Sequence, residues 1–406
     1  MFLKLLKYSL FIVLFFHVIE CREEQKVKGT DIPGNPYLNA LLEDYDLYVQ
    51  NQIRKGRSPG AAVAVVYDTS TVLLKGYGLK SYRSGEPVDI HTVFRLGSVS
   101  KGFASLLTGI LVQEGQVDWN DKIVDYLHDF SLKSEASTRE LNIRNVLSHT
   151  TGLPYHSYTN LIEAGWNLPG MIHALRDVNV IAPVGSIYSY QNVAYSIIAE
   201  VVQSATGENY QDLMKRRVFE PLHMNDASMS YQDIVNDSDL ALPHYRYKGS
   251  WKPQKIKDTY YNASPAGGVN ASISDMSKYL LALLGNDPGI IADSTLQTIF
   301  TPVIRTSKYK YSGSWKHLRR AYYGMGWRIF VTSEDTVVYH GGYVNGYRTE
   351  IALIPAKRTG ICVLTNASNH FASESIPAFF DKLHFWYDSI ASWQNRNAYL
   401  HYSTLP

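Results

Sequence analysis

The first third of the chain combines a helical pattern of apolar residues with two strand-like runs. Apolar side chains over residues 39–53 recur at the spacing of one helix face, and this pattern ends before Gly56 and Pro59. Residues 61–67 and 71–77 are apolar runs separated by a polar turn, which predicts an antiparallel hairpin. This part of the chain therefore predicts a surface helix packed on a sheet.

The middle of the chain, from about residue 94 to residue 284, is mainly helical in its pattern. One apolar stripe over residues 103–111 ends at Gly115, a residue type that favours a helix C-terminus. Residues 192–202 and 274–284 predict two further helices.

Strand patterns return after about residue 327, and a last helix follows them. The expected strands are 327–331, 336–340, 348–354 and 360–365, and the helix is 374–390. The simplest architecture is an α+β fold in which these strands join the N-terminal hairpin in one antiparallel sheet. The terminal helices flank the sheet, the central region is an inserted, mostly helical lobe, and the cleft between them is the expected active site.

The N-terminus has the pattern of an export signal. Lys4 and Lys7 precede mainly apolar residues 8–19, a stretch shorter than the roughly 18 to 20 residues of a spanning helix. We expect a signal peptide over residues 1–21, and Cys21 leaves open a lipoprotein leader. The protein is then periplasmic or secreted, with peripheral or anchored membrane association through the N-terminus as an open alternative.

Composition and charge exclude several classes of function. Lys and Arg total 39 and Asp and Glu total 37, so a net charge of +2 provides no surplus for binding nucleic acid. Cys21 and Cys362 are the 2 cysteines, too few for a disulfide framework or a zinc site of paired cysteines. His-Glu-x-x-His and Gly-x-Ser-x-Gly are both absent. We expect no metal, no other cofactor and no nucleic-acid partner.

The first candidate for chemistry is Ser98-Val-Ser-Lys101, where an extended segment passes into a helix. A serine at a helix start and a lysine three residues later share one face, so the amine can take the hydroxyl proton. Unsatisfied N–H groups at the helix start favour the oxyanion that follows attack on a carbonyl. The tetrapeptide alone decides nothing, because residues 307–310 repeat it and a capping serine beside a solvated lysine also explains it.

Longer segments carry a family resemblance. Residues 94–103, Phe-Arg-Leu-Gly-Ser-Val-Ser-Lys-Gly-Phe, closely resemble the nucleophile segment of the serine β-lactamase and penicillin-binding-protein superfamily, in its class C and D,D-peptidase-like branch. Further segments that resemble the family follow in the expected order: 141–154, 265–276 and 323–327. The resemblance implies a catalytic domain with a β-lactamase/D,D-peptidase-like fold. Its expected extent is 36–392, with an α/β lobe of 36–95 and 300–392, a helical lobe of 96–299 and a tail of 393–406.

The second element of this family is Tyr-x-Asn, which the surrounding Pro-x-Gly and the following helix assign to Tyr190-Gln191-Asn192. The resemblance implies that Tyr190 passes a proton to the leaving group as general acid and later acts as base. Phenols ordinarily have a pKa near 10, so this role needs nearby cations such as Lys101. Asn192 would hold the substrate amide by hydrogen bonds.

The third element departs from the class C pattern, because His340-Gly341-Gly342 stands where Lys-Thr-Gly is usual. It is similar to the His-x-Gly variant of peptidase and esterase relatives. The resemblance implies that the N–H of Tyr343 joins that of Ser98 in holding the oxyanion, and that Gly342 lets substrate lie against the strand. His340 would then supply polarity, or a charge that depends on pH.

These elements together imply a serine hydrolase with a Ser98 acyl-enzyme. We expect a small-molecule or peptidoglycan-peptide-like substrate, and a D,D-carboxypeptidase, D-amino-acid peptidase or esterase activity in the cell envelope. The missing lysine of the third element argues against an efficient class C-like β-lactamase, which stays an alternative. A non-catalytic penicillin-recognising binding module is the second alternative. His149 precedes a Gly-Leu-Pro turn, so we interpret it as structural.

Overall fold

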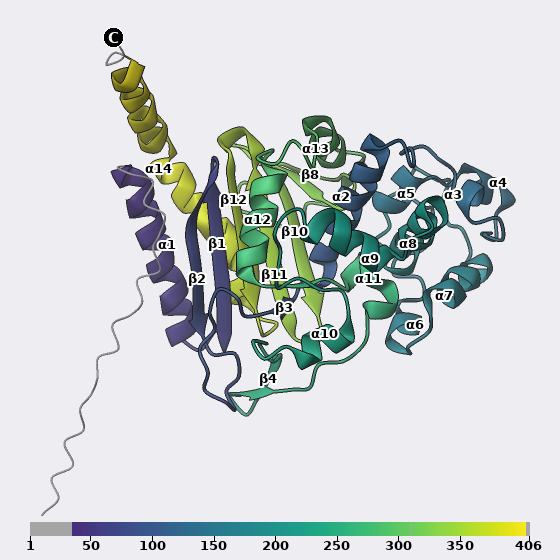
Figure 1. The fold of residues 1–406 in the computed structure, drawn as a ribbon, viewed down its shortest axis with the longest axis horizontal. Coiled ribbons are helices and arrows are strands. Elements are labelled where there is room, and N and C mark those ends of the chain that lie inside the picture. The colour runs from purple at the N-terminus through teal and green to yellow at the C-terminus, as the bar shows by residue number, and fades with distance from the viewer. Residues whose placement is uncertain (1–34, 310, 403–406) are drawn as a thin grey trace, which may run out of the picture.

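An antiparallel sheet of eight strands forms the centre of the molecule, in the order β2-β1-β12-β11-β10-β9-β8-β7 (Figure 1). The computed structural model describes residues 35–309 and 311–402, so the expected signal peptide over 1–21 lies outside the described residues. The strands are β1 Gly60–Tyr67, β2 Ser70–Gly78, β7 Ile304–Thr306, β8 Arg320–Tyr323, β9 Arg328–Val331, β10 Thr336–Val344, β11 Tyr347–Ile354 and β12 Thr359–Thr365.

Two strands at one edge of the sheet, β7 and β8, were not expected from the sequence. They have three and four residues, too few to establish an alternation of apolar and polar positions. Each also carries an exposed arginine, Arg305 and Arg320, which weakens the apolar signal. The other six strands lie where the sequence predicts them.

The N- and C-terminal helices pack against each other on one face of the sheet (Figure 1). They are α1, Pro36–Arg54, and α14, His370–Tyr402. Helix α14 begins before and ends after the predicted range of 374–390. Tyr45 of α1 meets Phe379 of α14 edge to face, with ring centroids 5.1 Å apart. The sheet supplies every second residue of β1 to this core, and Val63 is fully buried.

The opposite face of the sheet is covered by α12 and by the helical part of the chain. Ala62, Ala64 and Val66 of β1 point to this side, which explains why β1 is an unbroken apolar run buried on both faces. Among the described residues no helix is both long and apolar enough to cross a membrane. The helices are α2 Ser100–Gln113, α3 Ile123–Tyr126, α4 Glu135–Glu140, α5 Ile143–Leu147, α6 Thr159–Glu163, α7 Leu168–Ala174, α8 Val193–Thr206, α9 Tyr210–Met214, α10 Tyr231–Asn236, α11 Ser264–Gly267, α12 Ile273–Leu283 and α13 Asp293–Phe300.

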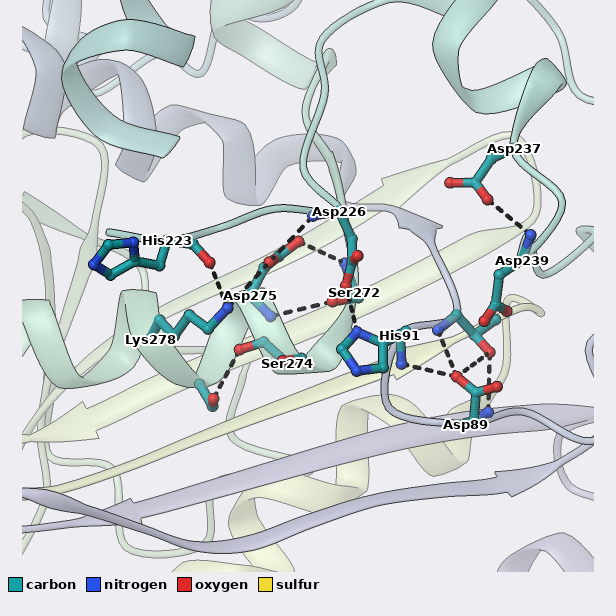
Figure 2. A network of polar contacts seen from close by, with 12 residues as sticks. Asp89, His91, His223, Asp226, Asp237, Asp239, Ser272, Ser274, Asp275 and Lys278 are labelled. Atoms are coloured by element: carbon teal, nitrogen blue, oxygen red, sulfur yellow. Dashed lines mark hydrogen bonds and ion pairs between the residues drawn. The ribbon is translucent and has the colours of Figure 1, made fainter. Parts of the chain in front are cut away.

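A polar network at the start of α12 ties together segments that are distant in sequence (Figure 2). Ser272 and Asp275 form a reciprocal capping box, in which the Ser272 hydroxyl accepts from the Asp275 N–H at 3.1 Å. Asp226, in the loop before α10, donates its N–H to the Asp275 carboxylate at 3.5 Å, and its own carboxylate lies 2.9 Å from the Nδ1 of His91. Burial, together with the Asp226 carboxylate, raises the pKa of Asp275 to about 6.

This raised pKa predicts a loss of stability with rising pH that Asp275→Asn removes. An unfolded aspartate titrates near pH 3.9, so Asp275 contributes fully below about pH 4, and its contribution is lost as pH rises through about 6. We expect the free energy of unfolding of the variant, relative to wild type, to rise by up to about 2 kcal/mol between pH 4 and pH 7.5. Urea unfolding at intermediate pH values measures this difference. A difference that stays constant or falls with pH would contradict the role of Asp275.

Candidate active site

Ser98 lies at the N-terminal end of α2, in a 3₁₀ turn, Gly97–Val99, that runs directly into this helix. It is the one partly exposed residue in the otherwise buried stretch 92–111. Strand β3, Phe94–Arg95, leads into the turn and pairs with β6, Asn270–Ala271. A serine hydroxyl is thus held on a buried framework and presented to solvent. By contrast, Ser307 of the repeated tetrapeptide lies in the loop after β7.

Lys101 is fully buried one turn along from Ser98. Its Nζ lies 3.4 Å from the Ser98 Oγ, 2.9 Å from the Asn192 Oδ1 and 2.8 Å from the carbonyl oxygen of Ala266. Burial, and then the nearby Arg328 cation, lower the pKa of Lys101 well below its usual value. A neutral amine has two N–H groups and one lone pair. In its neutral form the amine can donate these two N–H groups to Asn192 and Ala266, which leaves the lone pair for the serine hydroxyl, as a base requires.

Tyr190 and Asn192 enter this site from the segment before α8. The Tyr190 ring centroid lies 4.7 Å from the Lys101 Nζ, and the side chain is 6% exposed. Asn192 begins α8, and because its Oδ1 already accepts from Lys101, its amide NH₂ is the group that remains for a substrate carbonyl. The first two sequence-predicted elements therefore meet at Lys101.

Strand β10 brings the third element against the serine turn. A Cβ at Gly342 would lie 2.0 Å from the Leu96 carbonyl oxygen and 3.2 Å from the Ser98 nitrogen. Gly97 has a φ of +53°, and a Cβ there would meet the Tyr343 backbone at 2.8 Å. Both positions accept glycine alone because the two backbones touch. The amides of Ser98 and Tyr343 consequently belong to facing segments, as an oxyanion hole needs.

His340 is the site residue whose environment differs most from the expectation. Its side chain is fully buried, and its Nε2 lies 3.2 Å from the hydroxyl of Tyr323. Burial, followed by the nearby Arg328 and Lys101 side chains, lowers the pKa of His340 well below its usual range. The imidazole is therefore neutral at physiological pH, in contrast to the expected pH-dependent charge at the cleft.

The permanent cation of this site is Arg328, a residue that the sequence analysis did not select. Its guanidinium carbon lies 5.6 Å from the ring centroid of Tyr190, and its Nε donates to the Tyr311 hydroxyl at 2.7 Å. Arg328 directly follows the segment 323–327, but an arginine in a strand pattern is usually a solvent-facing residue. Only the folded arrangement shows that this one is beside Tyr190.

His149 packs beneath Tyr190, with ring centroids 4.3 Å apart. Its Nδ1 accepts the N–H of Gln191 at 3.2 Å, so the proton of the neutral ring is on Nε2. Burial, then Lys101 and Arg328, lower the pKa of His149 well below its usual value. These contacts hold the Tyr190 segment in place. Over residues 35–309 and 311–402 no group of three or more His, Cys, Asp or Glu could hold a metal ion.

Comparison with known proteins identifies the family. The family model described as Beta-lactamase matches residues 45–380. The chain belongs to the beta-lactamase family. In sequence it is similar to an unguisins hydrolase, ungD′, from Aspergillus campestris, at 27% identity over 86% of this chain and 64% of the relative. The homologous ungD from Aspergillus violaceofuscus is 26% identical, over 80% of this chain and 61% of the relative. The chain thus spans less than two thirds of the length of these two relatives.

A bacterial relative and two solved structures are also similar to the chain. Protein flp from Staphylococcus aureus is 22% identical over 88% of this chain and 70% of flp. An octameric penicillin-binding protein homologue from Pyrococcus abyssi has a TM-score of 0.73 at 23% identity, over 85% of this chain and 77% of that one. EstCE1, a hydrolase with promiscuous acyltransferase activity, also has a TM-score of 0.73, at 18% identity, over 85% of this chain and 98% of its own. The α+β fold expected from the sequence is confirmed.

The charge of Arg328 predicts a change in the pH profile when it is removed. Because this cation lowers the pKa of Lys101, Arg328→Gln should raise that pKa and move the acidic limb of kcat/KM to higher pH. At pH 7 we expect a loss of about tenfold with p-nitrophenyl acetate as substrate. Arg328→Lys should recover most of the profile, and Arg305→Gln on β7 is the matched control. An acidic limb that does not move in Arg328→Gln would refute this role.

Proposed function

We propose that Ser98 is the nucleophile of an acyl-enzyme hydrolase that cleaves a peptide-like amide, in the manner of a D,D-carboxypeptidase or D-amino-acid peptidase. The observation that carries the proposal is the buried Lys101 amine, 3.4 Å from the Ser98 hydroxyl, with its N–H groups directed to other acceptors. A buried amine with a lowered pKa differs from a solvated surface lysine and is suited to act as a general base.

In the proposed reaction Lys101 and Tyr190 each take up one proton and give up one proton. Lys101 takes the Ser98 proton while Oγ bonds to the substrate carbonyl carbon, and the N–H groups of Ser98 and Tyr343 stabilise the oxyanion. Tyr190 then gives its proton to the leaving nitrogen as the C–N bond breaks, which leaves a Tyr190 phenolate beside protonated Lys101. The phenolate takes a proton from the water that attacks the acyl carbon, and Lys101 gives its proton to the Ser98 oxygen as the acyl C–O bond breaks, which releases the acid and restores all three residues.

Two features favour an amide over a simple ester. An amine leaving group must be protonated, and Tyr190 lies within about 6 Å of the cations that would stabilise its phenolate, Lys101 and Arg328. Strand β10 pairs with β9 through Tyr339 and with β11 through Val344, so over residues 341–344 no described strand pairs with its second edge. An extended peptide can pair along that edge. Esterase activity is the second candidate, supported by the fold shared with EstCE1.

Covalent labelling of Ser98 tests the mechanism. Intact mass after incubation with a fluorophosphonate and with a fluorescent penicillin should show one adduct on wild type and none on Ser98→Ala. Lys101→Met should slow labelling by about 10² to 10⁴, because the base is lost. Ser307→Ala, in the repeated tetrapeptide, is the matched control and should label like wild type. Folded wild-type protein that neither reagent modifies would refute the acyl-enzyme and favour a non-catalytic binding module.

Two measurements distinguish a peptide substrate from an ester substrate. Penicillin labelling would favour a stem-peptide-like substrate, and labelling by the fluorophosphonate alone would favour an ester. Release of D-alanine from a peptide ending in D-Ala-D-Ala, compared with its L-Ala-L-Ala counterpart, then tests the peptidase directly. Equal hydrolysis of both peptides would contradict a D-amino-acid preference.

Turnover of nitrocefin is expected to be slow. The third element lacks lysine, and the neutral His340 does not replace that cation beside a β-lactam carboxylate. We expect acylation by nitrocefin with a turnover at least about a hundredfold below the hydrolysis of a preferred amide under the same conditions. Absorbance at the nitrocefin product wavelength measures it. Rapid multiple turnover would move the class C-like β-lactamase alternative ahead of the peptidase.

A further inference from the structure

A basic groove opens beside the third catalytic element. It is a cavity of about 760 Å³ between the end of α1, the hairpin of β4 (His244–Tyr247) and β5 (Ser250–Pro253), and the β10–β11 turn. No carboxylate of the described chain lines it. Its lining carries exposed cations from separate segments: Lys55, Arg57, Arg246, Lys255 and Lys257. We call the cavity that these five residues line the basic groove.

These cations are not neutralised by neighbours. Over residues 35–309 and 311–402 none of them forms an ion pair with a carboxylate, in contrast to surface cations such as Arg139, Arg216 and Lys382. A second hollow of about 750 Å³ shares Lys55, Arg246 and Trp251 and adds Arg54 and Lys252, again without a carboxylate from the described residues. In a protein with a net charge of only +2, this is a concentration of positive charge in one concave region.

The groove has a fixed framework. Arg246 donates to the Gly56 carbonyl at 2.6 Å and lies over the ring of Trp251, with 4.8 Å to the centroid. The indole N–H of Trp251 donates to the same carbonyl at 3.0 Å. Gln254 donates to the Asn345 carbonyl at 3.3 Å, which joins the hairpin to the β10–β11 turn. The groove is therefore formed before any ligand binds, which reduces the entropic cost of binding.

The groove is continuous with the proposed substrate path. Tyr343, whose N–H is the proposed second oxyanion donor, lines the groove with its exposed side chain, and Asn345 and Gly346 follow it there. A peptide paired with the second edge of residues 341–344 would leave the active site past Tyr343 and enter the groove. A substrate segment at this place meets lysine and arginine side chains beside aromatic surfaces.

We propose that the basic groove binds an acidic segment of a peptide substrate, in which Asp or Glu carboxylates extend beyond the bond that Ser98 attacks. This inference rests on the proposed function. Peptide carboxylates fit the separated cations beside the exposed Tyr343 ring, whereas duplex or single-stranded nucleic acid would need a basic track on a more positive chain. A membrane surface is flat and would meet the rim rather than the floor of the groove.

Binding to the full-length Ser98→Ala protein tests the groove without catalysis. Fluorescence anisotropy should show that labelled hexaglutamate binds at low salt, that hexaglutamine does not, and that added salt weakens binding. Lys255→Gln with Lys257→Gln should lower the affinity about tenfold. Lys215→Gln with Lys316→Gln removes the same charge from exposed positions elsewhere and should leave the affinity unchanged. Equal losses in both double variants would overturn the assignment to the groove.

Competition connects the groove to the active site. Hexaglutamate should slow fluorophosphonate labelling of Ser98 in wild type, and the protection should be lost in the Lys255→Gln, Lys257→Gln variant. Binding without protection would overturn the substrate-segment proposal. Tighter binding of oligothymidylate, or of phosphatidylglycerol vesicles over phosphatidylcholine vesicles, would overturn the choice of a peptide. A wild type that is never labelled would refute the hydrolase proposal, and the anisotropy difference between the double variants would still decide whether the groove binds acidic peptide.

Discussion

The removal of the Lys101 amine from water is the constraint on which the site depends. A charged ammonium would be costly at a fully buried position, so the neutral amine is favoured there. Three separate segments must converge to satisfy its polar valences: the start of α2, Asn192 before α8, and Ala266 in α11. Ser98 is a local neighbour of the amine, but Asn192 and Ala266 are 91 and 165 residues away in sequence, so only the fold brings them to it.

The backbone contact between the serine turn and β10 is the second requirement, and it links the two parts of the molecule. Gly97 and Gly342 allow the chains to approach within distances that any side chain would prevent. The strand can hold this position because the sheet behind it is packed on both faces, by α1 and α14 on one side and by α12 on the other. The packing of the core therefore also holds the amides of Ser98 and Tyr343 in position.

The sequence predicted the helices and strands whose pattern lies within one segment. It could not predict properties that depend on how deeply a side chain is buried in the fold. The apolar run of β1 and the stripe of α2 are patterns within one segment, and they are found where expected. The neutrality of His340 and the position of Arg328 beside Tyr190 depend on residues far away in the chain. A strand-end histidine and a strand arginine have the same sequence signal whether they face solvent or a buried tyrosine. Family resemblance located the motifs, but it carried no information on a charge that lies outside them.

The charge of Arg328 acts on both Lys101 and Tyr190. A permanent cation near Lys101 opposes protonation of the amine, and in the proposed mechanism the same cation would stabilise the phenolate that Tyr190 becomes when it gives up its proton. Beside Ser98, Lys101 and Tyr190, this charge would also repel the basic groups of a substrate. The basic groove beyond Tyr343 extends that preference along the path of a bound chain. Arg328 thus adds to the larger effect of burial on the pKa of Lys101, and the basic groove adds to the proposed preference for an acidic substrate.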